Sequence, residues 1–183
     1  MTKTILALLA ILSLNASAYA AEIDPKLSSF TWRGSKITGD YHAGQVSPES
    51  SSLTLVAGKI ESGEVVFAMN SITVSNLDGE WKDKFLGHIK GTDFFDVSKF
   101  PTTTLKLSSI KNGTAAGELT VKGVTQPISF TVKRVDATYV GKATFDRTKF
   151  GITFGSGSFF ENLGDKLIND AVDVEFTLAL KVE

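Results

Sequence analysis

The sequence contains no cysteine, and only two of its 183 residues are histidines, His42 and His88. The lack of cysteine excludes disulfide bonds, iron–sulfur clusters, thiolate zinc sites and thiol catalysis. A zinc or iron site would have to take most of its ligands from carboxylates, and the sequence around the two histidines shows no ligand spacing. We therefore expect no metal ion and no cofactor, and we interpret both histidines as polar side chains at the surface or at the mouth of a barrel.

The sequence also lacks an excess of charge of either sign. It has 19 lysines and arginines against 20 aspartates and glutamates, which gives a net charge of -1. This balance provides no basic surface for nucleic acid and no polybasic membrane anchor. Hydrophobic residues make up 42% and charged residues 21%, which is typical of one folded domain rather than a disordered chain.

Long hydrophobic runs are confined to the N-terminus. Lys3 precedes an apolar run over residues 5–14, and residues 18–20, Ala-Tyr-Ala, match the small-x-small pattern that signal peptidase cleaves. The run is too short to cross a bilayer comfortably, which disfavours the alternative of an N-terminal membrane anchor. We predict a signal peptide over residues 1–20 and a periplasmic mature domain over residues 21–183 without an integral membrane segment.

From residue 28 onward, apolar and polar residues alternate. In the cleanest run, residues 172–182, valine, phenylalanine and leucine at even positions oppose mostly polar residues at odd positions. This period of two is typical of antiparallel strands with one buried and one solvated face. Turn-forming residues separate the runs at Gly34-Ser35, Gly58, Gly63, Asn112-Gly113, Gly123 and Asp136. The pattern predicts an all-β fold of about eight short strands, arranged as a closed barrel or a sandwich.

Two segments break this alternation. Apolar residues spaced four apart from Trp81 predict a short helical insert near residues 80–96. At its end, Asp93-Phe94-Phe95-Asp96 fits neither period, and we interpret it as a structural turn that plugs or borders one end of the barrel. A second non-strand stretch is expected from about residue 155 to residue 169.

The apolar faces of the predicted strands are rich in phenylalanine, leucine and valine. A small barrel either fills its interior with side chains or leaves room for one ligand, and the period of two cannot separate these outcomes. Any cavity would be apolar. The residues that we expect to line the interior and bind a ligand are Phe30, Trp32, Phe67, Met69, Leu105, Leu107, Leu119, Val121, Phe130, Val132, Phe145, Phe176, Leu178 and Leu180.

The sequence shows no catalytic motif. It has no Gly-x-Ser-x-Gly elbow, and the nearest string, Gly155-Ser156-Gly157-Ser158, has the wrong spacing. Neither histidine has a nucleophile and a carboxylate arranged beside it in the sequence. We therefore predict a protein that is not an enzyme.

Five motifs follow one another along the chain. They are Ile23-Asp24-Pro25 with Ser28-Ser29-Phe30-x-Trp32, then Ser71-Ile72, then Leu86-Gly87-His88-Ile89-Lys90 with Asp93-Phe94-Phe95-Asp96 and Lys99-Phe100-Pro101, then Gly117-x-Leu119-Thr120-x-Lys122-Gly123-Val124-Thr125-x-Pro127, and last Asp146-Arg147-x-x-Phe150-Gly151. Together and in this order, they resemble the YceI-like family of secreted bacterial proteins. Each motif is modest alone, but the series spans nearly the whole mature chain.

The resemblance implies an extended, lipocalin-like antiparallel barrel with a hydrophobic tunnel for a long-chain lipid, such as a polyisoprenoid, an isoprenoid quinone or a fatty-acid derivative. We therefore expect periplasmic binding and transport or storage of such a lipid, with His42 or His88 contacting its head group. Two alternatives stay open. One is a lipid- or quinone-modifying enzyme that uses either histidine as acid or base. The other is a filled barrel whose Asp93-Phe94-Phe95 insert docks a partner protein. No nucleic-acid partner is expected, and the sequence leaves the oligomeric state open, a dimer included.

Overall fold

The structure, a computed structural model, describes residues 17–181. Most of the predicted signal peptide, residues 1–16, lies outside the described residues. The strands are β1 (Ala18–Ala21), β2 (Ser29–Lys36), β3 (Tyr41–Gln45), β4 (Ser47–Val56), β5 (Lys59–Ala68), β6 (Thr102–Lys111), β7 (Thr114–Val121), β8 (Val124–Val135), β9 (Thr138–Asp146) and β10 (Ile168–Ala179). One α-helix, α1 (Gly79–Lys90), and three short 3₁₀ helices, Met69–Ser71, Arg147–Phe150 and Gly164–Lys166, complete the described fold.

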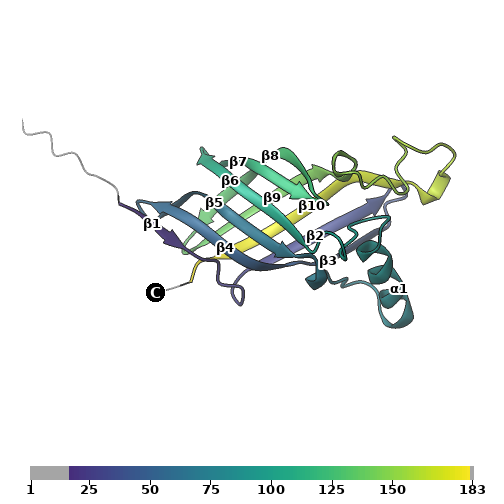
Figure 1. Cartoon of the computed structure of the whole chain (residues 1–183), viewed down its shortest axis with the longest axis horizontal. Coiled ribbons are helices and arrows are strands. Elements are labelled where there is room, and N and C mark those ends of the chain that lie inside the picture. The colour runs from purple at the N-terminus through teal and green to yellow at the C-terminus, as the bar shows by residue number, and fades with distance from the viewer. Residues whose placement is uncertain (1–16, 182–183) are drawn as a thin grey trace, which may run out of the picture.

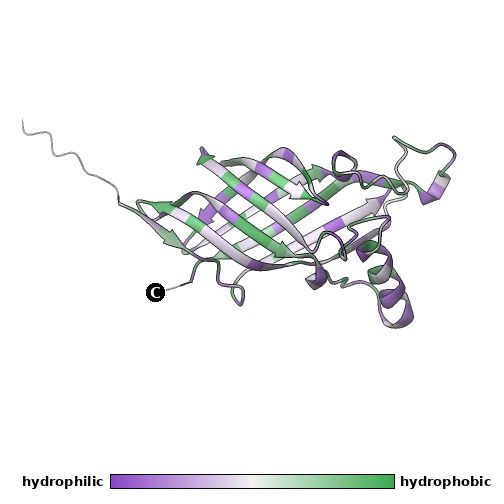
Figure 2. Ribbon diagram, in the orientation of Figure 1, coloured by the Kyte–Doolittle hydropathy of each residue, from purple (hydrophilic) through white to green (hydrophobic). Residues whose placement is uncertain are grey.

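All ten strands belong to one antiparallel sheet in the order β1-β4-β5-β6-β7-β8-β9-β10-β2-β3. The sheet curls into an elongated barrel, with α1 and the segment after β9 at one end (Figure 1). Hydrophobic and hydrophilic bands alternate along the strands, as the period of two requires when one sheet face is buried (Figure 2). The predicted single, antiparallel, lipocalin-like barrel is confirmed. It has ten strands instead of about eight, because β3 and β4 are separate strands divided by one residue and residues 18–21 form a further strand.

A seam runs between the two edges of the sheet, β1 and β3, and short segments bridge it at both ends. At the end that carries β1, the N–H of Asp24 donates to the Ala179 carbonyl at 2.9 Å. The neighbouring N–H of Ile23 donates to Ser51 Oγ at 2.8 Å. Residues 22–24 therefore connect β10 to β4 and close this end of the barrel.

At the opposite end, the free edge of β3 pairs with the loop that precedes α1. The N–H of Thr73 donates to the Gln45 carbonyl at 2.9 Å, and the N–H of Ser75 donates to the Ala43 carbonyl at 2.8 Å. Gly44 allows this approach, because a Cβ there would lie 1.8 Å from the Thr73 carbonyl oxygen. The loop thus continues the sheet beyond β3 and narrows the seam.

Two of the predicted turns lie inside strands. Gly34 and Ser35 belong to β2, and the turn follows at residues 37–40. Gly63 belongs to β5, next to a shift in the β4–β5 register. Its φ of +141° and the 2.4 Å that would separate a Cβ from the Ser52 carbonyl oxygen both require glycine. A strand glycine marks a bulge or a close backbone approach as well as a turn, and the sequence pattern alone does not separate these cases.

The buried side chains form one large cluster and two small ones. The large cluster fills the end closed by residues 22–24 and includes Ile23, Leu53, Leu55 and Tyr139. The two small clusters lie near the other end, one under α1 around Ile89 and one around Phe150. No helix within residues 17–181 is long and apolar enough to cross a membrane.

Candidate functional site: an apolar cavity in the barrel

A cavity of about 870 Å³ lies inside the barrel. This volume is within the range of about 300–1,000 Å³ that is usual for small-molecule sites. Its walls come from nearly every strand, from α1 and from the segments around Phe94 and Phe154. The interior is therefore not filled by side chains. Of the two outcomes that the alternation leaves open, a filled barrel and one with room for a ligand, the structure has the second.

The structure places the predicted interior residues on the cavity wall, with one exception. The predicted residues that line it are Phe30, Trp32, Phe67, Met69, Leu105, Leu107, Leu119, Val121, Phe130, Val132, Phe145, Phe176 and Leu178. Leu180 does not line the cavity, because it lies past the end of β10, pairs with Ile23 and packs into the large core cluster. That these side chains bind a ligand stays a prediction.

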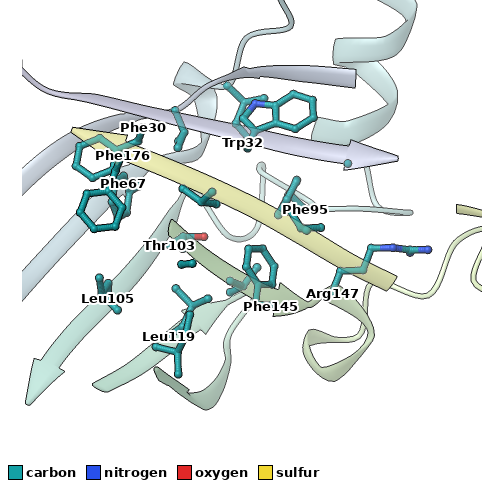
Figure 3. Close-up of a pocket in the computed structure, with 18 of the residues that line it drawn as sticks. Phe30, Trp32, Phe67, Phe95, Thr103, Leu105, Leu119, Phe145, Arg147 and Phe176 are labelled. Carbon is teal, nitrogen blue, oxygen red and sulfur yellow. The ribbon is translucent and has the colours of Figure 1, made fainter. Parts of the chain in front are cut away.

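Direct strand pairing gathers the aromatic rings in the middle of the cavity. Phe30 of β2 pairs with Phe176 of β10, and their rings stack with centroids 6.1 Å apart. Phe67 and Phe130 meet these rings edge to face, with centroid distances of 4.9 Å to Phe30 and 5.8 Å to Phe176. Gly141 leaves the space for the Phe176 ring, because a Cβ there would lie 2.5 Å from its Cζ. Figure 3 shows the side chains of Phe30, Phe67 and Phe176 close together.

His42 lies at the end of the cavity that faces α1. Its ring contacts the ring of Phe85 with centroids 4.4 Å apart, and Phe85 in turn stacks on Trp32 at 6.2 Å. The Nδ1 atom of His42 lies 3.3 Å from Oδ1 of Asn76. The imidazole is thus oriented by an amide and an aromatic ring.

His88 lines the same end of the cavity, on the last turn of α1. Its Nε2 lies 3.2 Å from the Asp93 carboxylate, and its ring meets Phe94 and Phe154 edge to face at 5.1 and 4.7 Å. The carboxylate and the two rings fix the imidazole at the opening. Both histidines are therefore placed where a head group would lie if an apolar chain filled the cavity, and head-group contact stays a prediction.

The Asp93-Phe94-Phe95-Asp96 block forms the turn that follows α1. The N–H of Phe95 donates to the Ile89 carbonyl at 3.1 Å, and Asp96 adopts a left-handed φ of +46°. Both phenylalanine rings are partly buried, pack against the small core clusters and line the cavity. This placement fits the interpretation of the block as a structural border of one barrel end.

A sequence profile of the YceI-like domain matches residues 22–180. The chain belongs to the YceI-like family. A UPF0312 protein of Shewanella oneidensis is 27% identical over 165 residues, which cover 82% of this chain and 84% of that protein. A UPF0312 protein of Pseudomonas aeruginosa is 32% identical over 108 residues, about half of each chain.

Solved structures show the same fold at low identity. Burkholderia cenocepacia BcnA aligns with a TM-score of 0.63 at 20% identity, covering 87% of this chain and 99% of that one. A polyisoprenoid binding domain from Saccharophagus degradans aligns with a TM-score of 0.62 at 14% identity, covering 89% and 98%. The YCEI protein of Campylobacter jejuni aligns with a TM-score of 0.51 at 15% identity, covering 100% and 94%. These neighbours place the chain in the YceI-like, lipocalin-like architecture.

In this YceI-like chain, Arg147 is a cavity residue that the alternation did not identify. Its side chain is only 4% exposed, although it is charged. The guanidinium donates to the carbonyls of Ile152, Phe154, Ile168 and Asn169 at 2.8–3.1 Å. Arg147 therefore ties the segment after β9 to the start of β10.

Charge balance around Arg147 comes from two carboxylates. The Asp170 carboxylate lies 3.5 Å from the guanidinium. Burial lowers the pKa of Arg147, and the negative charges of Asp170 and Asp146 oppose that change. For Asp146, burial acts to raise the pKa, but hydrogen bonds from the side chain and backbone of Thr148, together with the positive charges of Lys149 and Arg147, lower the pKa overall. Asp146 and Arg147 belong to the last of the family motifs in the sequence, but the alternation of apolar and polar residues gives no indication that Arg147 is buried.

Two further wall residues carry hydroxyl groups inside the barrel. Tyr139 is buried, and its hydroxyl accepts a hydrogen bond from the Ile60 N–H at 3.0 Å across the closed end. Thr103 lines the cavity near Phe67 and Leu105, and its Oγ1 is buried without a hydrogen-bond partner among the described residues (Figure 3). Both occupy the inward positions of their strands. The sequence prediction missed them because it assigned only apolar residue types to the inner face.

Proposed function

We propose that this protein binds a long-chain lipid in the barrel cavity, for transport or storage, and performs no catalysis. The observation that carries the proposal is the apolar cavity of about 870 Å³, whose walls are formed by the inward faces of the strands. The ligand is a polyisoprenoid, an isoprenoid quinone or a fatty-acid derivative. No cofactor is needed, because binding relies on burial of the apolar chain.

The energetics favour recognition through the tail of the ligand. Each methylene-sized group removed from water contributes about 0.8 kcal/mol, so that a few isoprene units supply more than about 10 kcal/mol before association costs. Those costs remove several kcal/mol. A hydrogen bond from His42 or His88 to a head group adds only about 0.5–1.5 kcal/mol, or up to about 3 kcal/mol for a charged head group. Affinity should therefore depend on the aromatic wall more than on the histidines.

The comparisons support the ligand class. The structural neighbour from Saccharophagus degradans is described as a polyisoprenoid binding domain, and it shares the fold of this chain. A lipid carrier also agrees with the predicted signal peptide over residues 1–20, which would deliver the mature protein to the periplasm. There, the barrel would shield a water-insoluble chain while it crosses an aqueous compartment.

The experiment that tests the proposal is purification of the protein from its own host, followed by native mass spectrometry and organic extraction. A lipid that co-purifies in stoichiometric amount is expected. Ala143 lines the cavity from the middle of β9, so Ala143→Phe places a ring in the lumen and should abolish co-purification. Ser129→Phe adds the same ring on the exposed, outer face of β8 and should leave the lipid in place. Equal occupancy in both variants would contradict binding in the cavity.

A double variant separates the carrier from the enzyme alternative. His42→Ala combined with His88→Ala should keep lipid affinity within about two orders of magnitude of the parent, because the tail dominates. Loss of all lipid from a folded double variant would overturn the tail-dominated proposal in favour of a head-group-centred one. Recovery of a chemically converted lipid from the parent, but not from the double variant, would instead favour an enzyme.

A further inference from the structure

Large apolar side chains are exposed around the mouth of the cavity. They lie on three separate segments, the β2–β3 turn with the first residue of β3, the first turn of α1 and the segment after β9. The rim, as we define it, consists of Ile37, Tyr41, Trp81, Phe154, Phe159 and Phe160, which are between 42% and 73% exposed. Tyr41 and Phe154 also line the cavity, so the rim is continuous with the cavity wall.

Backbone hydrogen bonds hold two of these segments together. The N–H of Ile37 donates to the Leu167 carbonyl at 3.1 Å, and the N–H of Ile168 donates to the Gly155 carbonyl at 2.8 Å. Phe159 and Phe160 lie on the loop between Gly155 and Leu167. Trp81 lies one helical turn before Phe85, whose ring faces the cavity. In Figure 1, α1 and this loop lie at the same end of the barrel, opposite β1.

The charge of these segments is nearly balanced. Residues 36–41, 79–84 and 154–167 together carry four basic and five acidic side chains. An attachment surface with this composition cannot depend on attraction to an anionic partner. Aromatic rings on protruding segments are instead suited to the boundary between lipid head groups and hydrocarbon.

We propose that the rim inserts into the surface of a lipid bilayer and presents the mouth of the cavity directly to the hydrocarbon. This inference rests on the proposed function, since a lipid-binding cavity needs a source of lipid. Each methylene that must cross water slows transfer by about fourfold, so that a long chain moves efficiently only where cavity and membrane touch. Tyr41 and Phe154 belong both to the rim and to the cavity wall, so a bilayer that takes up the rim would also meet the cavity.

The test is partitioning of the mature protein, purified from its own host without the predicted signal peptide, onto phosphatidylcholine vesicles, measured by co-sedimentation. We expect binding that changes by less than about threefold between low salt and 0.5 M salt, because it relies on apolar insertion. Phe159→Ser combined with Phe160→Ser should lower the partition coefficient by about tenfold or more. The matched control, Leu27→Ser combined with Val135→Ser, removes exposed apolar side chains at the opposite end and should bind as the parent does.

A fluorescence measurement reports insertion directly. The chain has two tryptophans, so Trp32→Phe leaves Trp81 as the reporter. Its emission should shift to shorter wavelength on the vesicles and should be quenched by lipids that carry a spin label near the head group. Absence of the shift and of vesicle binding would overturn the proposal. Binding that requires phosphatidylglycerol and disappears in 0.5 M salt would overturn it as well, in favour of electrostatic attachment.

Two controls distinguish insertion into a bilayer from lipid binding in the cavity and from dimer formation through the rim. Ala143→Phe fills the cavity without touching the rim, so vesicle binding should persist in that variant even if no lipid is carried. If the rim instead joins two copies of the chain, analytical ultracentrifugation will show a dimer that Phe159→Ser with Phe160→Ser dissociates, and the bilayer proposal fails. Capture of a soluble protein by the rim, with no vesicle binding, would overturn it too.

Discussion

The two ends of the barrel are built in different ways. At the end that carries β1, adjacent strands are joined by two-residue turns at residues 57–58, 112–113 and 136–137, and residues 22–24 bridge the seam. At the mouth, two connections are long: residues 69–101 carry α1, and residues 147–167 carry two 3₁₀ helices, beside shorter turns at residues 37–40 and 122–123. The closed end is held by local turn chemistry and dense packing, whereas the mouth is held by a few specific side chains.

The tight turns of the closed end follow from residue type. Ala57-Gly58 and Asn112-Gly113 each place two successive residues at positive φ, between +50° and +77°. Two-residue hairpins favour this conformation, because its twist matches that of the flanking strands. At the mouth, Lys122-Gly123 follows the same rule, with φ of +50° and +75°, but the two long connections do not, and they depend on specific side chains. The predictions below test this difference in order of expected effect.

The largest effect is expected for Arg147→Met. The variant removes the donors that hold four backbone carbonyls of the mouth segment, and one of these hydrogen bonds is buried and three are part-buried. We expect the free energy of unfolding to fall by about 3–5 kcal/mol, measured by urea denaturation. Arg134 is the matched control at the closed end, where its exposed side chain donates to the Gly58 and Asp136 carbonyls. Arg134→Met should cost less than about 1 kcal/mol, and equal losses in the two variants would remove the contrast between the ends.

Removing one buried hydrogen-bond acceptor at the closed end should lower the stability of the protein. Tyr139→Phe keeps the ring in the core but leaves the Ile60 N–H without its partner. We expect a loss of about 1–3 kcal/mol of unfolding free energy. Tyr41→Phe, at the exposed rim, should change stability by less than about 0.5 kcal/mol. A neutral Tyr139→Phe would mean that packing alone holds the closed end.

The difference between the ends also explains how far the sequence could be interpreted. Alternation predicted the barrel and the inward residues such as Phe30 and Phe130, because burial on one sheet face imposes a period of two on every strand. It did not predict Leu180 correctly, because the period assigns a residue to a face without saying where the strand ends. It missed Arg147, because the burial of that side chain depends on carbonyls supplied by a segment 5 to 22 residues away. The sequence pattern also did not predict the exposed rim, because aromatic residues in loops follow no period that would indicate their exposure.

A smaller effect concerns acid stability at the mouth. The hydrogen bonds from Thr148 Oγ1 and N–H to Asp146, at 2.6 and 2.9 Å, hold its pKa below the ordinary value of 3.8. Because the folded pKa is lowered, the stabilising contribution is complete above the unfolded pKa and is lost as the pH falls below about 4. We expect Asp146→Asn to lower the Tm at pH 7 by a few degrees and to reduce its dependence on pH between about 5 and 3. A variant that keeps the full acid dependence of the parent would show that other carboxylates govern it.

The smallest effect, and the one of opposite sign, is expected at Thr103, between the two ends. Its Oγ1 is buried and has no hydrogen-bond partner within residues 17–181, so the folded state bears the desolvation of a hydroxyl without compensation. Thr103→Val replaces the hydroxyl by a methyl group of similar shape and removes that penalty. We expect a gain of up to about 1 kcal/mol in unfolding free energy and unchanged or tighter retention of an apolar chain, measured by denaturation and by lipid extraction. Thr104→Val, at the neighbouring position that faces the other side of β6, is the control and should be neutral within about 0.5 kcal/mol. If Thr103→Val instead empties the cavity while the fold stays intact, the hydroxyl is a polar contact for the bound molecule, and the ligand carries a hydrogen-bonding group deep in the barrel rather than only at its mouth.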